Sequence, residues 1–260
     1  MLLAIDVGNT QTVIGLFDSS SLLNSWRMAT PKHQTSDEIG SAVLSFMKNC
    51  GHDSSNVHSI AVSCVVPVIS DAIKKMGQRY FGCGVFMVQS SIKTKIKLNY
   101  DYPGEIGADR IANSVAAAEI YGCPAIVVDF GTATTFDIIS SEREYVGGVI
   151  APGIEISSEA LFSYAAKLSK VDFSWPEKVI AKNTYDAIRA GILYGFLGQV
   201  DFLLEKIMDE QKRQGRRSEP SVIGTGGLAS LMKDRSRFIK IFDPDLTLKG
   251  LQLLYSYNNC

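Results

Sequence analysis

Two short stretches of the sequence place a carboxylate, a glycine and hydroxyl or amide side chains in the same order. They are Asp6–Thr10 and Asp129–Ala133, each preceded by an apolar run, and each reads Asp, apolar residue, Gly, then a hydroxyl or amide residue. Thr12 and Thr135 follow the two aspartates at the same offset. A glycine after a strand lets the backbone approach a ligand, and successive N–H groups of such a turn can bind an anion. Both stretches therefore predict a phosphate site.

The two aspartates add a means of holding a cation against those phosphates. Asp6 and Asp129 would follow buried strands, and carboxylates bind a divalent cation or its water shell. Phosphoryl transfer needs little more than such positioning and neutralisation of charge. One copy alone would be read as an ordinary turn with a capping side chain, but a second copy nearly half a chain away argues against that reading. The neutral donors of the two turns are Asn9, Thr10, Thr132, Thr134 and Thr135.

A third candidate is Gly107–Arg110, which opens an alanine-rich helical segment. Asp109 falls in the first turn, where the helix dipole favours a negative charge, and the simple interpretation is a capping aspartate. The functional interpretation is an ionised general base beside an arginine that binds an anion. A base stabilised in this way is weak, so it would orient a hydroxyl and take its proton late.

A glycine cluster, Gly224–Gly227, follows the apolar Val222 and Ile223. Glycine at this density lets a flat ring or a ribose lie against the backbone. Taken alone, the cluster fits an ordinary strand–helix loop equally well.

The amino-acid composition limits the kinds of molecule that the protein is expected to bind. The chain has 260 residues, with 26 Lys and Arg against 27 Asp and Glu. This balance argues against nucleic acid as a partner, because binding phosphate backbones needs a basic face. The five cysteines, Cys260 among them, form no C-x-x-C pair and indicate reduced thiols in the cytoplasm. No apolar run approaches the ~20 residues that span a membrane, so we expect a soluble protein.

The elements that must position these residues alternate between strand and helix. Strands are predicted at Leu2–Ile5, Thr12–Phe17, Ser59–Val66, Val85–Val88 and Ala125–Asp129. Helices are predicted after a cap at Ser36 or Asp37, from about Ser70 to Tyr80, over Ala108–Tyr121 and over Gln199–Gln211. The alternation indicates an α/β fold. The repeated turns indicate two copies of one domain, residues 1–122 and 123–260, with a cleft between them.

Four motifs together resemble those of type III pantothenate kinase. They are Asp6–Thr10, Gly107–Arg110, Asp129–Thr135 and Thr225–Gly227. Shorter segments match in the same order, so the resemblance covers essentially the whole chain. These segments are Arg27 with Thr35–Glu38, Val62–Pro67, Gly147–Gly148 with Ala151–Gly153, Asn183–Thr184 and Arg189–Gly191.

The resemblance implies the fold of the acetate kinase, sugar kinase, heat-shock protein and actin superfamily, with two ribonuclease-H-like halves. It implies ATP-dependent phosphorylation of pantothenate to 4′-phosphopantothenate, the first step of coenzyme A biosynthesis. It also implies a homodimer, Mg²⁺ with ATP, and a monovalent cation, K⁺ or NH₄⁺.

The resemblance further implies roles for individual residues. Asp109 would be the proton acceptor, Asp129 would coordinate the monovalent cation, and Asp6 would lie near Mg²⁺. Pantothenate would contact Tyr100, Gly107, Ala108, Asp109, Arg110 and, from across the dimer interface, Thr184. ATP would contact Asp6, Val7, Gly8, Asn9, Thr10, Gln11, Thr12, Val13, Thr132, Gly226 and Gly227.

Two departures and three rival readings accompany the resemblance. Leu168-Ser169 replaces a common Leu-Pro, and Ala181 replaces a common Gly before Lys-Asn-Thr. A non-catalytic regulator would be expected to have lost one of the three aspartates, which this chain keeps. A kinase for acetate or a sugar is disfavoured by Gly107–Arg110, and an actin-like filament protein would be longer.

Overall fold

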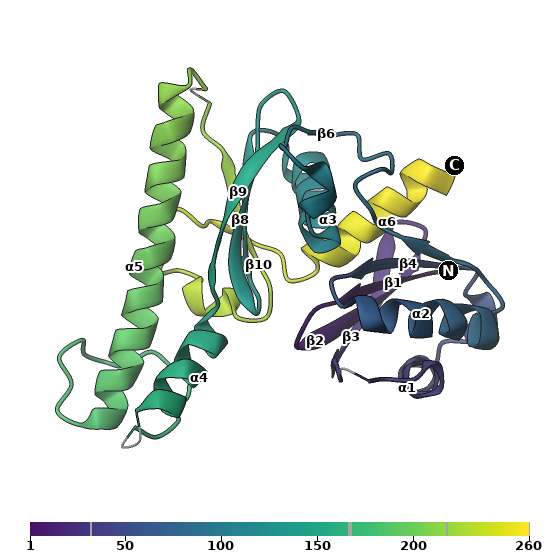
Figure 1. The fold of residues 1–260 in the computed structure, drawn as a ribbon, viewed down its shortest axis with the longest axis horizontal. Helices are drawn as coiled ribbons and strands as arrows, with labels where there is room; N and C mark the ends of the chain where they lie inside the picture. Colours follow the sequence, from purple (N-terminus) through teal and green to yellow (C-terminus); the bar gives the residue numbers. More distant parts are fainter. Residues whose placement is uncertain (32, 166–167, 217, 260) are drawn as a thin grey trace. The chain divides into compact units, whose positions relative to one another are not determined.

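The computed structural model describes residues 1–31, 33–165, 168–216 and 218–259, so Cys260 lies outside the described residues. The chain forms two compact units (Figure 1). The first comprises Met1–Ile120 together with Asp245–Cys260, and the second comprises Tyr121–Pro244. The sequence predicted a single division near Gly122, whereas in the structure the last residues of the chain belong to the first unit.

The return of the chain is explained by helix packing. The last helix, α6 (Leu246–Asn259), packs on α3 (Ala108–Ala116). A Cβ atom built on Gly250 would lie 2.0 Å from the carbonyl oxygen of Ala112, so the two helices approach at a glycine. Close backbone approach of this kind is available only to a residue without a side chain.

The sheet of the first unit has the strand order β3-β2-β1-β4-β5. Strands β1, β2 and β3 are antiparallel neighbours, whereas β1, β4 and β5 run parallel. Their bounds are Leu2–Val7 for β1, Gln11–Asp18 for β2, Ser21–Ala29 for β3, Ser59–Cys64 for β4 and Val85–Met87 for β5.

The second unit repeats this arrangement. Its strands follow the order β9-β8-β7-β10-β11, with β7, β8 and β9 antiparallel and β7, β10 and β11 parallel. Because a single strand order appears in both units, the duplication inferred from the twin turns is confirmed in the fold. Their bounds are Ala125–Phe130 for β7, Ala133–Ile139 for β8, Glu144–Pro152 for β9, Ser221–Thr225 for β10 and Ile241–Phe242 for β11.

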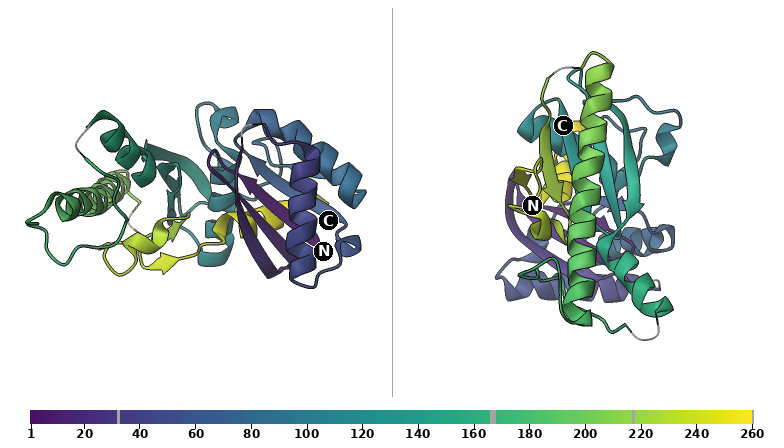
Figure 2. Two further views of the ribbon diagram at one scale, coloured as in Figure 1. Left: turned by 90° about the horizontal axis from the view of Figure 1, so that it is seen from below. Right: turned by 90° about the vertical axis from the view of Figure 1, so that its left-hand side faces the viewer.

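Helices cover both faces of the first sheet. α1 (Ser36–Asn49) and α2 (Pro67–Met76) bury Leu3, Ile5 and Ile60 on one face. On the other face α6 contacts β1 and β4, and α3 contacts β4 (Figure 2). The cap of α1 is Thr35, which forms a reciprocal capping box with Glu38, so the prediction of Ser36 or Asp37 was wrong. α2 and α3 continue as π-helical turns to Phe81 and Tyr121, close to the predicted helix ends. The short elements are Ser54–Asn56, Pro103–Glu105 and β6 (Lys97–Leu98).

The second unit contains the helices α4 (Ile154–Tyr164) and α5 (Thr184–Arg213), of which α5 is the longer (Figure 2). A short helical turn lies at Ala229–Met232. The sequence predicted α5 only from residue 199, because three glycines interrupt the apolar pattern before it. Leu193, Val200 and Leu204 of α5 are buried. α5 is also the one described helix long and apolar enough to cross a membrane, a test that core helices of water-soluble proteins also pass.

Candidate active site

The first Asp-x-Gly turn joins β1 to β2 and presents an exposed tip. The Gly8 N–H donates to the Gln11 carbonyl oxygen at 3.0 Å, and a Cβ atom on Gly8 would lie only 3.0 Å from that oxygen. Asn9 and Thr10 at the tip are exposed to solvent. The tight turn therefore needs a glycine and leaves its polar tip accessible.

The base of this turn is anchored by residues from β3 and the segment after it. Arg27 donates to the side-chain oxygen of Gln11 at 2.8 Å, and Thr30 donates its N–H to the Thr10 carbonyl oxygen at 2.9 Å. The hydroxyls of Thr12 and Thr30 are 2.8 Å apart and buried. The Thr12 hydroxyl thus anchors the turn, so its side chain differs in function from the exposed tip residues.

The second turn joins β7 to β8 and is one residue shorter. The Gly131 N–H donates to the Ala133 carbonyl oxygen at 3.1 Å. Asp6 pairs with Val13 across the first hairpin, whereas Asp129 pairs with Thr135 across the second. The equal offset of Thr12 and Thr135 seen in the sequence therefore does not make them structurally equivalent.

Asp129 lies directly against the third glycine motif. β10 runs parallel to β7, with Thr225 opposite Asp129. Gly226 has φ of +92°, and a Cβ atom on it would lie 2.4 Å from Asp129 Oδ1 and 2.7 Å from the Phe130 nitrogen. Only glycine satisfies both the backbone conformation and this approach. Two motifs far apart in sequence thus form one site in the second unit.

Gly153, which caps α4, also packs on this turn. Its N–H donates to the Thr132 carbonyl oxygen at 3.1 Å, and a Cβ atom there would lie 2.5 Å from the Gly131 carbonyl oxygen. No role for Gly153 was predicted from the sequence. The sequence does show a glycine directly before the residues that form α4, which could have marked Gly153 as a special position. The contact of Gly153 with the turn between β7 and β8 cannot be seen in the sequence.

Asp109 lies at the start of α3 and folds back over Gly107. Its Oδ1 accepts a hydrogen bond from the Arg110 N–H at 2.8 Å, and a Cβ atom on Gly107 would lie 2.4 Å from that oxygen. Burial raises the pKa of the Asp109 carboxyl, and the Arg110 N–H and guanidinium oppose this effect. The expectation of a carboxylate stabilised into a weak base was therefore wrong, because desolvation outweighs the stabilising contacts.

The other predicted substrate residues of the first unit lie near the start of α3 in sequence. Ala108 and Arg110 belong to its first turn, and Arg110 is 8% exposed. Tyr100 is half-buried in the segment between β6 and Pro103–Glu105. The first unit thus carries Asp6, Tyr100 and Gly107–Arg110.

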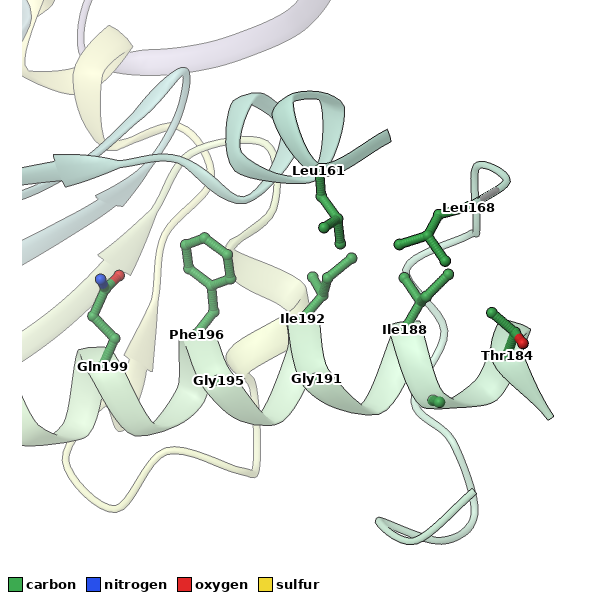
Figure 3. Close-up of a pocket in the computed structure, with 10 residues that line it drawn as sticks. Leu161, Leu168, Thr184, Ile188, Gly191, Ile192, Gly195, Phe196 and Gln199 are labelled. Atoms are coloured by element: carbon green, nitrogen blue, oxygen red, sulfur yellow. The ribbon is translucent and has the colours of Figure 1, made fainter. Parts of the chain in front are cut away.

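Thr184 lies elsewhere, at the start of α5 in the second unit. It lines a groove of about 570 Å³ formed with Leu161 of α4, Leu168, and Ile188 and Ile192 of α5 (Figure 3). The groove is apolar apart from Thr184 and Gln199 at its ends. It is therefore distinct from the site formed by Asp129, Thr132 and Gly226 in the same unit.

The donors fit a divalent metal that arrives with a nucleotide. The described residues contain no cluster of three or more His, Cys, Asp or Glu side chains that could hold a metal by themselves. Mg²⁺ commonly keeps several waters and binds through one or two carboxylates plus substrate phosphates. Asp6, half-buried beside an exposed polar turn, provides one such carboxylate.

Comparison with known proteins points to one family. Residues 2–206 match the model of the type III pantothenate kinase family. The chain is 46% identical over 258 residues to a type III pantothenate kinase from Bacillus cytotoxicus, covering 99% of this chain and 97% of that one.

Solved structures share the fold at lower identity. A protein described as a Baf family transcriptional activator from Campylobacter jejuni has a TM-score of 0.60 at 20% identity, covering 98% of each chain. Component A of (R)-2-hydroxyglutaryl-CoA dehydratase from Acidaminococcus fermentans has a TM-score of 0.57 at 12% identity, covering 98% of this chain and 97% of that one.

Proposed function

The chain belongs to the type III pantothenate kinase family, and on that premise we propose which of its residues carry out the reaction. The enzyme phosphorylates pantothenate with ATP in coenzyme A biosynthesis. The single observation that carries the residue assignment is the half-buried Asp109 carboxylate at the start of α3, beside Arg110, with its pKa raised by desolvation.

Asp109 is the proton acceptor. When the pantothenate hydroxyl oxygen forms its bond to the γ-phosphorus, the bond from that phosphorus to the ADP oxygen breaks and Asp109 takes the hydroxyl proton. A raised pKa makes the ionised carboxylate a stronger base than a solvated aspartate. Arg110, together with Gly107, Ala108 and Tyr100, holds pantothenate.

The two Asp-x-Gly turns bind the phosphates of ATP. The first turn, residues 6–13, contacts phosphate oxygens through its exposed tip at Asn9 and Thr10, as a glycine-containing turn with exposed polar residues allows. Asp6 would hold the divalent metal that accompanies ATP, and that metal would neutralise phosphate charge. Thr132, Gly226 and Gly227 contact ATP in the second unit.

Asp129 coordinates a monovalent cation, K⁺ or NH₄⁺. The support is that the residue packed against the carboxylate is a glycine, since a Cβ atom on Gly226 would lie 2.4 Å from Asp129 Oδ1. Such large cations suit sites built from carboxylate and carbonyl oxygens.

The enzyme acts as a homodimer in the cytoplasm, with Thr184 contacting substrate. The support for a dimer is the α4–α5 groove and the exposed side chains around it, which include Leu161, Tyr164 and Tyr185. Cβ atoms on Gly191 and Gly195 would meet nothing within 4 Å, so packing within the described chain does not explain these glycines. The close approach of a second copy of the chain would explain why these positions are glycines.

The test is ADP release from the purified protein with Mg·ATP and K⁺, with and without pantothenate. We expect release that depends on pantothenate, with phosphopantothenate identified by mass. ATP binding without turnover would instead support a non-catalytic regulator.

A further inference from the structure

A buried hydroxyl stands beside Asp6 on the neighbouring strand. β1 and β4 are parallel, and Ser63 of β4 is the register partner of Asp6. Adjacent strands lie about 4.8 Å apart, and in-register partners project to the same face of a sheet. Ser63 and Asp6 therefore form a polar pair, one residue before the end of each strand.

This pair lies on the face opposite the main core of the first unit. Ile5, Val7 and Val62, which alternate with the pair, belong to that core. The preceding register partners on the face of the pair are Ala4 and Ala61. On this face, a pair of small apolar residues is therefore followed by a carboxylate and a hydroxyl, close to where the turn begins.

The Ser63 hydroxyl is fully buried without a hydrogen-bond partner among the described residues. Its exposure is 0%, and its Oγ atom has no donor or acceptor within reach. Buried polar groups in native proteins nearly always have a partner, and one without a partner calls for an explanation. A serine hydroxyl can both donate and accept, so a ligand with polar groups would satisfy it.

The second unit repeats the arrangement. Thr225 of β10 is the register partner of Asp129 and is 1% exposed. Each of the paired aspartates is thus accompanied by a buried hydroxyl on the adjacent parallel strand, in two halves whose sequences otherwise diverge. The repetition favours a role tied to the aspartates over a local packing accident.

We propose that Ser63 is a positioning residue of the nucleotide site, whose hydroxyl hydrogen-bonds the water shell of the divalent cation held by Asp6. The inference rests on the proposed function, since it takes residues 6–13 as the phosphate site. Mg²⁺ retains several waters when bound through few carboxylates, and those waters need acceptors around them. Ser63 Oγ is such an acceptor, already desolvated and adjacent to the carboxylate.

The test measures ADP affinity by calorimetry with Mg²⁺ and with EDTA, without pantothenate, so that catalysis plays no part. For Ser63→Ala we expect ADP binding about tenfold weaker with Mg²⁺, which corresponds to the loss of one hydrogen bond, and little change with EDTA. Ser63→Thr keeps the hydroxyl, as at Thr225, and should retain most of the Mg²⁺ effect. Ser114→Ala is the matched control, because Ser114 Oγ is also fully buried without a partner.

The ADP affinities of these variants decide whether Ser63 acts through the metal. Equal losses with Mg²⁺ and with EDTA, no loss at all, or the same loss in Ser114→Ala would overturn the role of Ser63. A Ser63→Ala protein that fails to fold would also overturn it, since the hydroxyl would then be structural. Asp6→Asn separates this inference from the proposed function: if it leaves Mg·ADP binding unchanged, the phosphate site itself is misassigned, whatever Ser63 does.

Discussion

At the scale of single residues, the environment of a carboxylate decides its chemistry. Asp6 and Asp129 lie near strand ends beside turns, whereas Asp109 lies at the start of a helix, where burial raises its pKa. Asp109 is desolvated at the start of a helix, where its ionised form is costly for the folded protein. Costly ionisation of this kind is typical of a general base rather than of a stabilising cap.

Asp109→Asn should lower turnover by about 10²-fold or more, the usual contribution of a general base, while ADP binding is kept. Steady-state kinetics and calorimetry measure the two effects. Near-normal turnover would remove Asp109 from the role of base.

The same variant should unfold at a higher temperature than the wild type at pH 7. Because the pKa of Asp109 is raised in the folded protein, its stability contribution is present below the unfolded pKa and lost as pH rises through the folded pKa. The asparagine variant lacks this loss, so the difference in Tm should be larger at pH 7 than at pH 4. An equal difference at both pH values would contradict a raised pKa.

Asp129→Ala should abolish the response of the enzyme to K⁺. In the wild type, replacing K⁺ and NH₄⁺ by Na⁺ should weaken the use of ATP. The KM for ATP in each salt, for both proteins, measures the effect. A variant that still responds to K⁺ would place the cation elsewhere.

At the scale of elements, parallel neighbours bring the glycine motif of β10 to the turn after β7. The match between Asp129 and Gly226 depends on this pairing and on the positive φ of the glycine. A second link closes the unit: the Tyr121 hydroxyl donates to Asp243 at 2.8 Å, joining its first residue to one near its end.

Gly226→Ala should destabilise the protein by about 1–3 kcal/mol, the cost of a residue held in strained backbone. The added methyl would also press on the Asp129 carboxylate, so the K⁺ response should weaken as well. Denaturant unfolding gives the first quantity. Gly84→Ala, where a Cβ atom meets nothing within 4 Å, is the control and should leave both properties unchanged.

Tyr121→Phe should flatten the alkaline loss of stability. Burial, and then the hydrogen bond and charge of Asp243, raise the pKa of Tyr121 from 10.0 to about 12. This contribution to stability is present below the unfolded pKa and disappears as pH rises through the folded pKa. Between pH 9 and pH 12 the Tm of the wild type should therefore fall more steeply than the Tm of Tyr121→Phe. An equal fall of Tm in the two proteins would refute the contribution of the Tyr121–Asp243 hydrogen bond.

At the scale of the whole molecule, the same strand order occurs in both units, but the two units do not correspond to the two halves of the sequence. The final helix packs with the first unit, so the polypeptide passes from the first unit to the second and back. α5 carries an apolar surface with two open glycines that the described chain does not cover. We take this surface as the dimer interface of the proposed function.

Gly195→Gln should give a folded monomer. The side chain has open space in one chain, and replacing a helical glycine adds about 0.5–1 kcal/mol of helix stability. It would nevertheless block the close approach of a second copy. Light scattering measures the mass, with Gly84→Gln as the control expected to remain dimeric; a dimeric Gly195→Gln would place the interface elsewhere.

The sequence alone determined the repeated turns, the strands β1, β2, β4, β5 and β7, the family resemblance and the candidate aspartates, because these depend on local residue order and on hydrophobic period. It placed the cap of α1 one or two residues late and missed the first half of α5, where glycines break the pattern. The tertiary structure decided what depends on neighbours from distant parts of the chain. Burial sets the pKa of Asp109, β10 brings Gly226 to Asp129, and Gly250 lets α6 return to α3. Desolvation and close backbone contact arise only once the chain has folded, which is why residue order could not reveal them.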